Sequence, residues 1–274
     1  MQPPTMVAVA LAAVGSVVLA MHTMGGKSAA KQLGKVHFKT SCKPAAQAQF
    51  DRAMLYQHSF WYRASQRVFE DAQKADPDCA IAHWGTALSL LWNPHAAPPA
   101  KNLVEGAAAL EKGKAIAAKA TPRERDYLEA LGAMYKDHDK VDHRTRVLNY
   151  AKAMEQLAQR HPDDDEAQIH YALALNISAS PADKTYANQL KGAAILEKIH
   201  ERQPQHPGVT HYLIHLHDYP AIAEKGLEAA KRVRRDRTGR APCAAHAFAH
   251  FHARRLLEGV DRIQPRLSPR GQGA

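Results

Sequence analysis

The chain has 274 residues, of which 45% are apolar and 23% charged, a balance that excludes wholesale disorder. Three cysteines are too few for a disulfide-rich scaffold or a four-thiolate zinc site. The net charge is +10, but residues 233–274, with nine Arg against three acidic residues, carry +6 of it. The remainder is too weakly basic for a nucleic-acid-binding surface, so we expect no nucleic-acid partner.

The N-terminal segment predicts export. Residues 7–20 read VAVALAAVGSVVLA, which is too short for a comfortable membrane span but suits a secretory signal, with a cleavage point after Ala20. No Lys or Arg precedes this run, so an uncleaved anchor and an apolar tail on a cytoplasmic protein stay open. We assign 1–25 to a signal peptide or anchor and 26–44 to a linker, and expect a periplasmic protein with no further membrane span.

Export would place two of the cysteines where a disulfide can form. Cys42 and Cys79 are 37 residues apart, and each lies just before a predicted helix. In an oxidising compartment they could form a disulfide, provided that the fold brings their Cα atoms within roughly 7 Å. The alternative is two unrelated small residues.

Residues 45–232 carry a helical pattern interrupted by turns that contain proline. Thr121, Pro122 and Glu124 predict a capping box at the start of one helix. The spacing predicts helical hairpins over 45–76, 80–119, 122–160 and 163–203, and a fifth that begins at 207 and ends near Arg232.

Small and aromatic residues recur at fixed positions in these hairpins. With Pro77 placed near the end of a unit of about 34 residues, the first unit has small and aromatic residues in the order Ala53, Tyr56, Ser65, Phe69 and Ala72. Ala87 and Ala172 are the matching small residues of later units, and 92–99 (WNPHAAPP) and 178–184 lengthen two hairpins.

This pattern resembles the tetratricopeptide-repeat (TPR) family over roughly residues 45–232. Phrases such as HPGVTHYLIHLHDYP (206–220) look like one subgroup of uncharacterised bacterial repeat proteins. The resemblance implies an all-α fold, a right-handed α-solenoid of stacked antiparallel hairpins, and implies no reaction.

Residues 233–274 lack the repeat positions and are rich in Arg, Pro and Ala. Read one base later with suitable codons, 233–265 admits a helical string that resembles the next repeat unit. We therefore interpret 233–274 as a frameshift product, a basic and mostly disordered tail. The alternative is a natural tail that binds an acidic partner or nucleic acid. A frameshift would make the chain a truncated fragment without function of its own, which resequencing around the Arg232 codon would test.

One constellation carries metal-binding chemistry. His211 and His215 are one helical turn apart, which is the spacing of two imidazoles on one metal ion such as zinc. His217 and Asp218 follow directly, and His170 on the preceding unit is the expected ligand from a neighbouring hairpin. The alternative is that these histidines only pack in the core.

The leading functional hypothesis is a monomeric scaffold that binds a protein or peptide partner and has no catalysis of its own, because nucleophile, phosphate-loop and zinc-protease motifs are absent. Its concave groove would be lined by the first helix of each unit. The residues expected on that face are Trp84, Leu88, Ile169 and Leu173. The second hypothesis is a metal-binding or metal-dependent protein that uses the 211–218 cluster.

Overall fold

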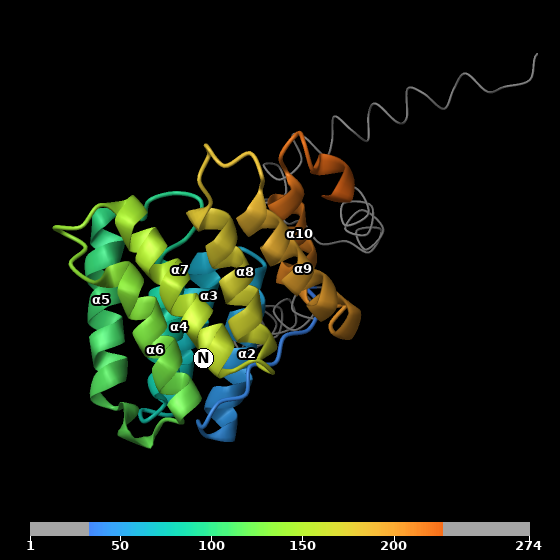
Figure 1. Cartoon of the computed structure of the whole chain (residues 1–274). Helices are drawn as coiled ribbons and strands as arrows, with labels where there is room; N and C mark the ends of the chain where they lie inside the picture. The colour runs from blue at the N-terminus through green and yellow to red at the C-terminus, as the bar shows by residue number, and fades with distance from the viewer. Residues whose placement is uncertain (1–32, 227–274) are drawn as a thin grey trace, which may run out of the picture.

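The computed structural model describes residues 33–226, and within that range all regular structure is helical (Figure 1). The all-α class is therefore confirmed. The α-helices are α2 (Pro44–His58), α3 (Tyr62–Ala75), α4 (Ala80–Leu90), α5 (Ala100–Ala115), α6 (Pro122–Tyr135), α7 (His143–Arg160), α8 (Asp165–Ser178), α9 (Ala187–Arg202) and α10 (Pro207–His217). Two short 3-10 turns span Ala117–Lys119 and Ala223–Gly226.

Helix starts follow local sequence chemistry. The predicted capping box is present: the Thr121 side chain accepts from the Glu124 backbone N–H, and the Glu124 carboxylate accepts from the Thr121 backbone N–H. Asp142 and Asp164 cap α7 and α8 in the same way, through a side-chain oxygen. The imidazole of His206 caps α10, directly before Pro207. Each cap satisfies backbone donors that have no partner inside the helix.

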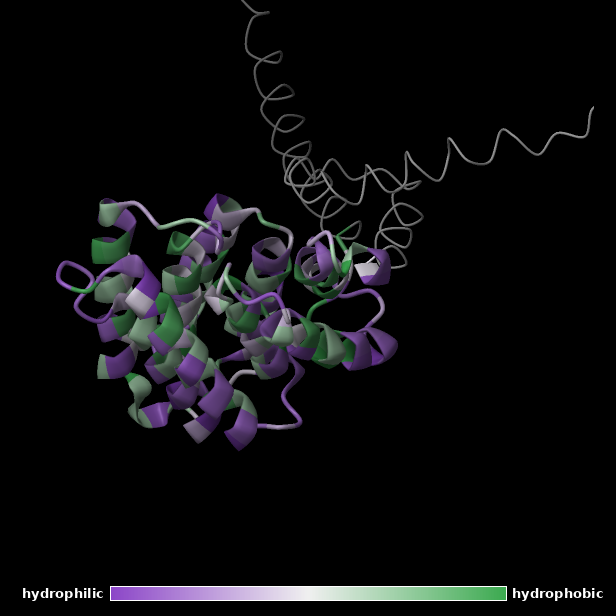
Figure 2. Cartoon of the chain, turned by 45° about the horizontal axis from the view of Figure 1, so that its top comes forward, coloured by the Kyte–Doolittle hydropathy of each residue, from purple (hydrophilic) through white to green (hydrophobic). Residues whose placement is uncertain are grey.

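Consecutive helices pack against one another along the chain, and α10 also contacts α8 and α2. The last described helix therefore returns to the first. Small residues allow the close contacts: Ala53, Ser65 and Ala72 are fully buried, and the Ser65 hydroxyl donates to the Ala53 carbonyl across α2 and α3 at 2.9 Å. Figure 2 shows that the helices carry both hydrophobic and hydrophilic residues, as expected of helices that bury one face and expose the other.

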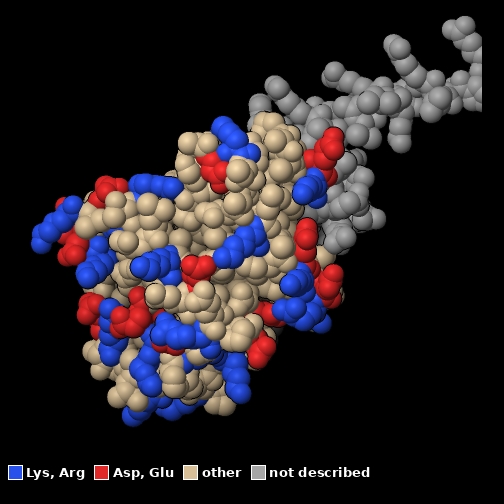
Figure 3. Space-filling model, viewed as in Figure 1, with Lys and Arg blue, Asp and Glu red and all other residues tan. Residues whose placement is uncertain are grey.

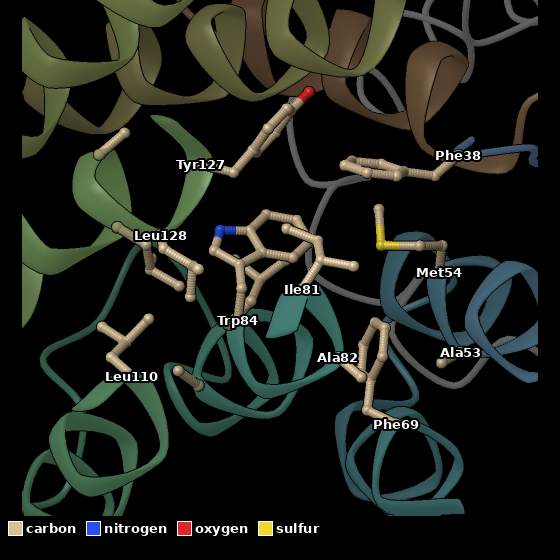
Figure 4. Packing of buried hydrophobic residues seen from close by; sticks show 14 of the residues in the cluster. Phe38, Ala53, Met54, Phe69, Ile81, Ala82, Trp84, Leu110, Tyr127 and Leu128 are labelled. Carbon is tan, nitrogen blue, oxygen red and sulfur yellow. The ribbon is translucent and has the colours of Figure 1, made fainter. Parts of the chain in front are cut away.

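The larger of the two core clusters contains a group of aromatic rings packed among Ala, Leu and Met side chains (Figure 4). Phe38 lies 5.0 Å from both Phe50 and Tyr127, and 5.7 Å from Trp84, between ring centroids. Phe38 comes from the segment 33–43, which precedes α2 and crosses the inner face of the helices. Its backbone is anchored at both ends: Lys35 N–H donates to the Gln205 carbonyl, and Ser41 N–H donates to Glu124.

The segment 33–43 is thus part of the folded domain, and the expectation of a linker over 26–44 is wrong from residue 33 onward. An isolated Phe between polar residues carries no periodicity, so its burial was not visible in the sequence. The predicted signal peptide (1–25) and the predicted frameshifted tail (233–274) lie outside the described residues, as does the end of the fifth hairpin.

Lys and Arg side chains are interspersed with Asp and Glu on the face seen in Figure 3. Across 33–226, every helix is too short or too polar to span a bilayer.

Candidate functional site

The residues expected to line a peptide groove lie mostly in the interior. Trp84, Leu88 and Ile169 are 3%, 7% and 0% exposed. Phe38 packs on Trp84, and Ile169 belongs to a second apolar cluster shared by α8, α9 and α10. These three are core residues, which corrects the expectation that they face a partner. Leu173 is half-buried.

Cys42 and Cys79 are joined by a disulfide, with Cα atoms 5.0 Å apart. The bond ties Cys42, two residues before α2, to Cys79, the residue directly before α4. It thereby fixes the segment 33–43 at the edge of the aromatic core.

His211 and His215 come together on α10. Their Nε2 atoms are 2.9 Å apart, and their ring centroids 4.7 Å. His211 is buried and His215 half-buried, so the pair lies at the edge of the core. The helix places the two rings together because residues four apart share one face.

A third imidazole reaches this pair from the extra residues that follow α4. His95 lies beside His215, with ring centroids 4.8 Å apart, and is exposed to solvent. Phe60, in the turn between α2 and α3, packs on the other side, 4.2 Å from the His211 ring. We refer to His95, His211 and His215 as the imidazole cluster. Sequence reasoning missed His95, and the only available signal was a histidine within the 92–99 insertion.

The other predicted ligands lie elsewhere. The ring neighbours of His170 are Trp84 and His58, at 5.6 Å each. His217 is buried against Gly226, and Asp218 ends α10. A helix rotates residues 211 and 217 onto different faces, so His217 does not extend the pair. His95, and not His170, is therefore the histidine that lies next to this pair, beside His215.

A second group of histidines surrounds a buried carboxylate. The two oxygens of Glu166, at the start of α8, lie 2.9 Å from His58 Nε2 and 3.1 Å from His206 Nε2. His58 Nδ1 lies 3.1 Å from the Tyr212 hydroxyl, and His206 Nδ1 accepts the backbone N–H groups of Gly208 and Val209. We call these four side chains (His58, Glu166, His206 and Tyr212) the Glu166 network; none of its first three members is more than 4% exposed.

The electrostatics of the network follow from this arrangement. Burial acts to raise the pKa of Glu166, but the interactions with His58 and His206 outweigh it and hold that pKa well below its usual value. Burial lowers the pKa of His206. The hydrogen bond to Glu166 acts to raise that pKa, but it offsets the effect of burial only in part. Since His206 Nδ1 accepts two backbone bonds, its proton resides on Nε2 and is donated to the carboxylate.

Glu166, His58 and His206 also form a set whose candidate ligand atoms all lie within 4.8 Å of one another. Two imidazoles and a carboxylate are donors that zinc accepts. In this network, however, each of those atoms already has a hydrogen-bond partner inside the protein. The network is satisfied without an ion, and it holds α2, α8 and α10 together.

No protein-family model, curated protein or solved structure matches this chain.

Proposed function

We propose that this protein binds a divalent transition metal ion, with zinc as the representative, through His95, His211 and His215. The observation that carries the proposal is the 2.9 Å separation of the two Nε2 atoms on α10, with the imidazole of His95 beside His215. Two imidazole nitrogens on one zinc ion, each about 2.0–2.1 Å from it, are roughly 3 Å apart. The pair therefore needs little rearrangement to hold an ion.

The ionisation of the cluster supports the same chemistry. A metal ion binds the neutral imidazole and competes with protons for it. Partial loss of hydration lowers the pKa of His95 and so favours the neutral ring. His95 lies on an exposed loop, which gives an ion a route to His215 and His211. Three protein ligands leave a fourth position of a tetrahedral ion for water or an external group.

The proposal also covers the arrangement of the helical hairpins and the cellular compartment of the protein. We assign the helical hairpins to a tightly curved TPR-like solenoid, a right-handed array in an exported protein. The burial of the small residues Ala53, Ala72 and Ala172 supports the repeat register. The Cys42–Cys79 disulfide supports an oxidising compartment. A peptide scaffold is less well supported, because most of the expected groove residues are buried.

Zinc titration of the full chain tests the proposal by calorimetry, after removal of bound metal with a chelator. We expect one ion per chain, and a loss of affinity of more than about a hundredfold in His211→Ala or His215→Ala, since losing a direct ligand should cost more than losing a group that only orients one. His95→Ala should weaken binding less, by about tenfold, because the α10 pair remains.

The matched control is His138→Ala, in the turn that follows α6, which should bind zinc as the unchanged chain does. Equal affinity in the unchanged chain, His211→Ala and His215→Ala would show that the α10 pair is a hydrogen bond in the core and that the ion binds elsewhere or not at all.

A further inference from the structure

A pocket separate from the imidazole cluster lies beneath the loop 92–98. Its walls come from α2, α3, α4, α6, α7, α8 and α10, with Gln57 and Tyr62 as the contributions of α2 and α3, and its roof comes from Trp92, Pro94, Ala96 and Pro98. Leu88, Met134, Tyr150, Leu173 and Tyr212 are among the side chains that line it. The lining contains no Lys, Arg, Asp or Glu. An ionic ligand would therefore be desolvated there without an opposite charge, which excludes it.

Two imidazoles in the lining of this pocket each have a buried nitrogen without a hydrogen-bond partner. His170 Nε2 and His143 Nδ1 are both buried, have no hydrogen-bond partner, and belong to residues of the pocket lining. The Glu166 carboxylate lies 3.9 Å from His170 Nε2, which is beyond hydrogen-bond distance. Buried polar atoms are nearly always paired, so two unpaired ones in a single pocket indicate a missing partner.

Both rings are neutral at neutral pH. Burial lowers the pKa of His170 to about 4, and burial together with Arg146 lowers the pKa of His143. A neutral imidazole offers one donor and one acceptor. A ligand group that both donates and accepts, such as a hydroxyl, can pair with the ring in either tautomer.

The size of the pocket limits the ligand. The cavity volume is about 40 Å³, and the empty space under the loop is about 580 Å³ when space open to solvent is included. A single ring or a short chain is therefore the largest body that this pocket takes without a change in the core, and the loop 92–98 must adjust to cover it.

We infer that this pocket binds a small neutral alcohol of the phenol class, with its apolar body against Leu88, Tyr150 and Leu173 and its hydroxyl on His170. This inference does not depend on the metal-binding proposal, because none of the imidazole-cluster residues lines the pocket. It gives His170 a partner that the protein itself does not provide.

Phenol and benzene are the matched probes, since they differ only in the hydroxyl group. Binding to the full chain is measured by calorimetry with a chelator present, so that failure of the zinc site does not affect the outcome. We expect phenol to bind about tenfold more tightly than benzene, the effect of one buried hydrogen bond. His170→Phe should remove this preference and leave benzene binding unchanged, and His138→Phe should alter neither.

A measurement on the unchanged chain covers the case in which His170→Phe does not fold. The ring ¹⁵N resonances of His170 should shift on addition of phenol and stay in place on addition of benzene. Absence of binding by both probes, equal affinity for both, or an unshifted His170 ring under saturating phenol would each overturn the inference.

Discussion

The Glu166 network and the imidazole cluster are both built from histidines, but the surroundings of the ring nitrogens differ. In the network, a carboxylate orients two imidazoles, and backbone N–H groups and a tyrosine hydroxyl occupy their remaining nitrogens. In the cluster, two Nε2 atoms face each other at 2.9 Å, and a third ring lies at the surface. Histidine content therefore says little about metal binding.

Removal of the carboxylate should have the largest effect. In Glu166→Ala, His58 and His206 stay buried but lose the carboxylate that accepts their hydrogen bonds. Loss of one partner in such a buried group lowers the free energy of unfolding by about 3–5 kcal/mol. Chemical denaturation should show this as a lower midpoint. Glu111→Ala, an exposed carboxylate next to Lys114, serves as control and should change stability by less than about 0.5 kcal/mol. A stable Glu166→Ala protein would show that the network does not hold the helices together.

Removal of the disulfide should lower the stability of the whole domain without changing the zinc affinity of the imidazole cluster. Because Cys42 and Cys79 are 37 residues apart in the sequence, replacing both with Ser should lower the free energy of unfolding by about 3–4 kcal/mol, mostly through the unfolded chain. Neither cysteine contacts the imidazole cluster. Zinc affinity should therefore match that of the unchanged chain at a temperature where both are folded, and a large loss would mean that the cluster depends on the segment 33–43.

Acid should destabilise the protein through the buried groups. His170 and His206 have lowered pKa values in the fold, so below the usual histidine pKa the unfolded chain binds protons that the folded chain does not. Stability is then lost as the pH falls from about 6.5 toward 4. Below the usual glutamate pKa, Glu166 adds to the loss, because it stays ionised only in the fold.

The contribution of His170 can be measured by substitution. His170→Phe should reduce the loss of stability between pH 6.5 and 4 by up to about 3 kcal/mol, since its pKa in the fold is about 4. Denaturation at a series of pH values checks this, with His138→Phe as the control. An identical pH dependence in His170→Phe and the unchanged chain would mean that His170 is not the group that resists protonation.

Much of the fold was readable from the sequence because its signals are local. Thr121 and Glu124 are three residues apart, and their capping box needs only the helix that contains them. Ala53 and Ser65 meet within one hairpin, and His211 and His215 within one helix. In each case, the distance along the chain determines the distance in space.

The remaining features join residues far apart in the chain. Phe38 fills the inner face of the helices, His58 meets Glu166, and His95 meets His215. These contacts depend on how strongly the succession of helices curves, which returns α10 to α2. A single sequence gives the order of the hairpins but not their curvature. For the same reason, the expected groove residues Trp84 and Ile169 are interior residues.

The loop 92–98 contributes to both the imidazole cluster and the pocket. His95 lies beside His215, while its neighbours Pro94 and Ala96 form part of the roof of the pocket. Two binding events that share one loop are thermodynamically linked, and the linkage acts equally in both directions. An ion held by His95 would fix the roof, so a ligand that needs the roof to move would bind more weakly. By the same factor, that ligand would weaken the ion.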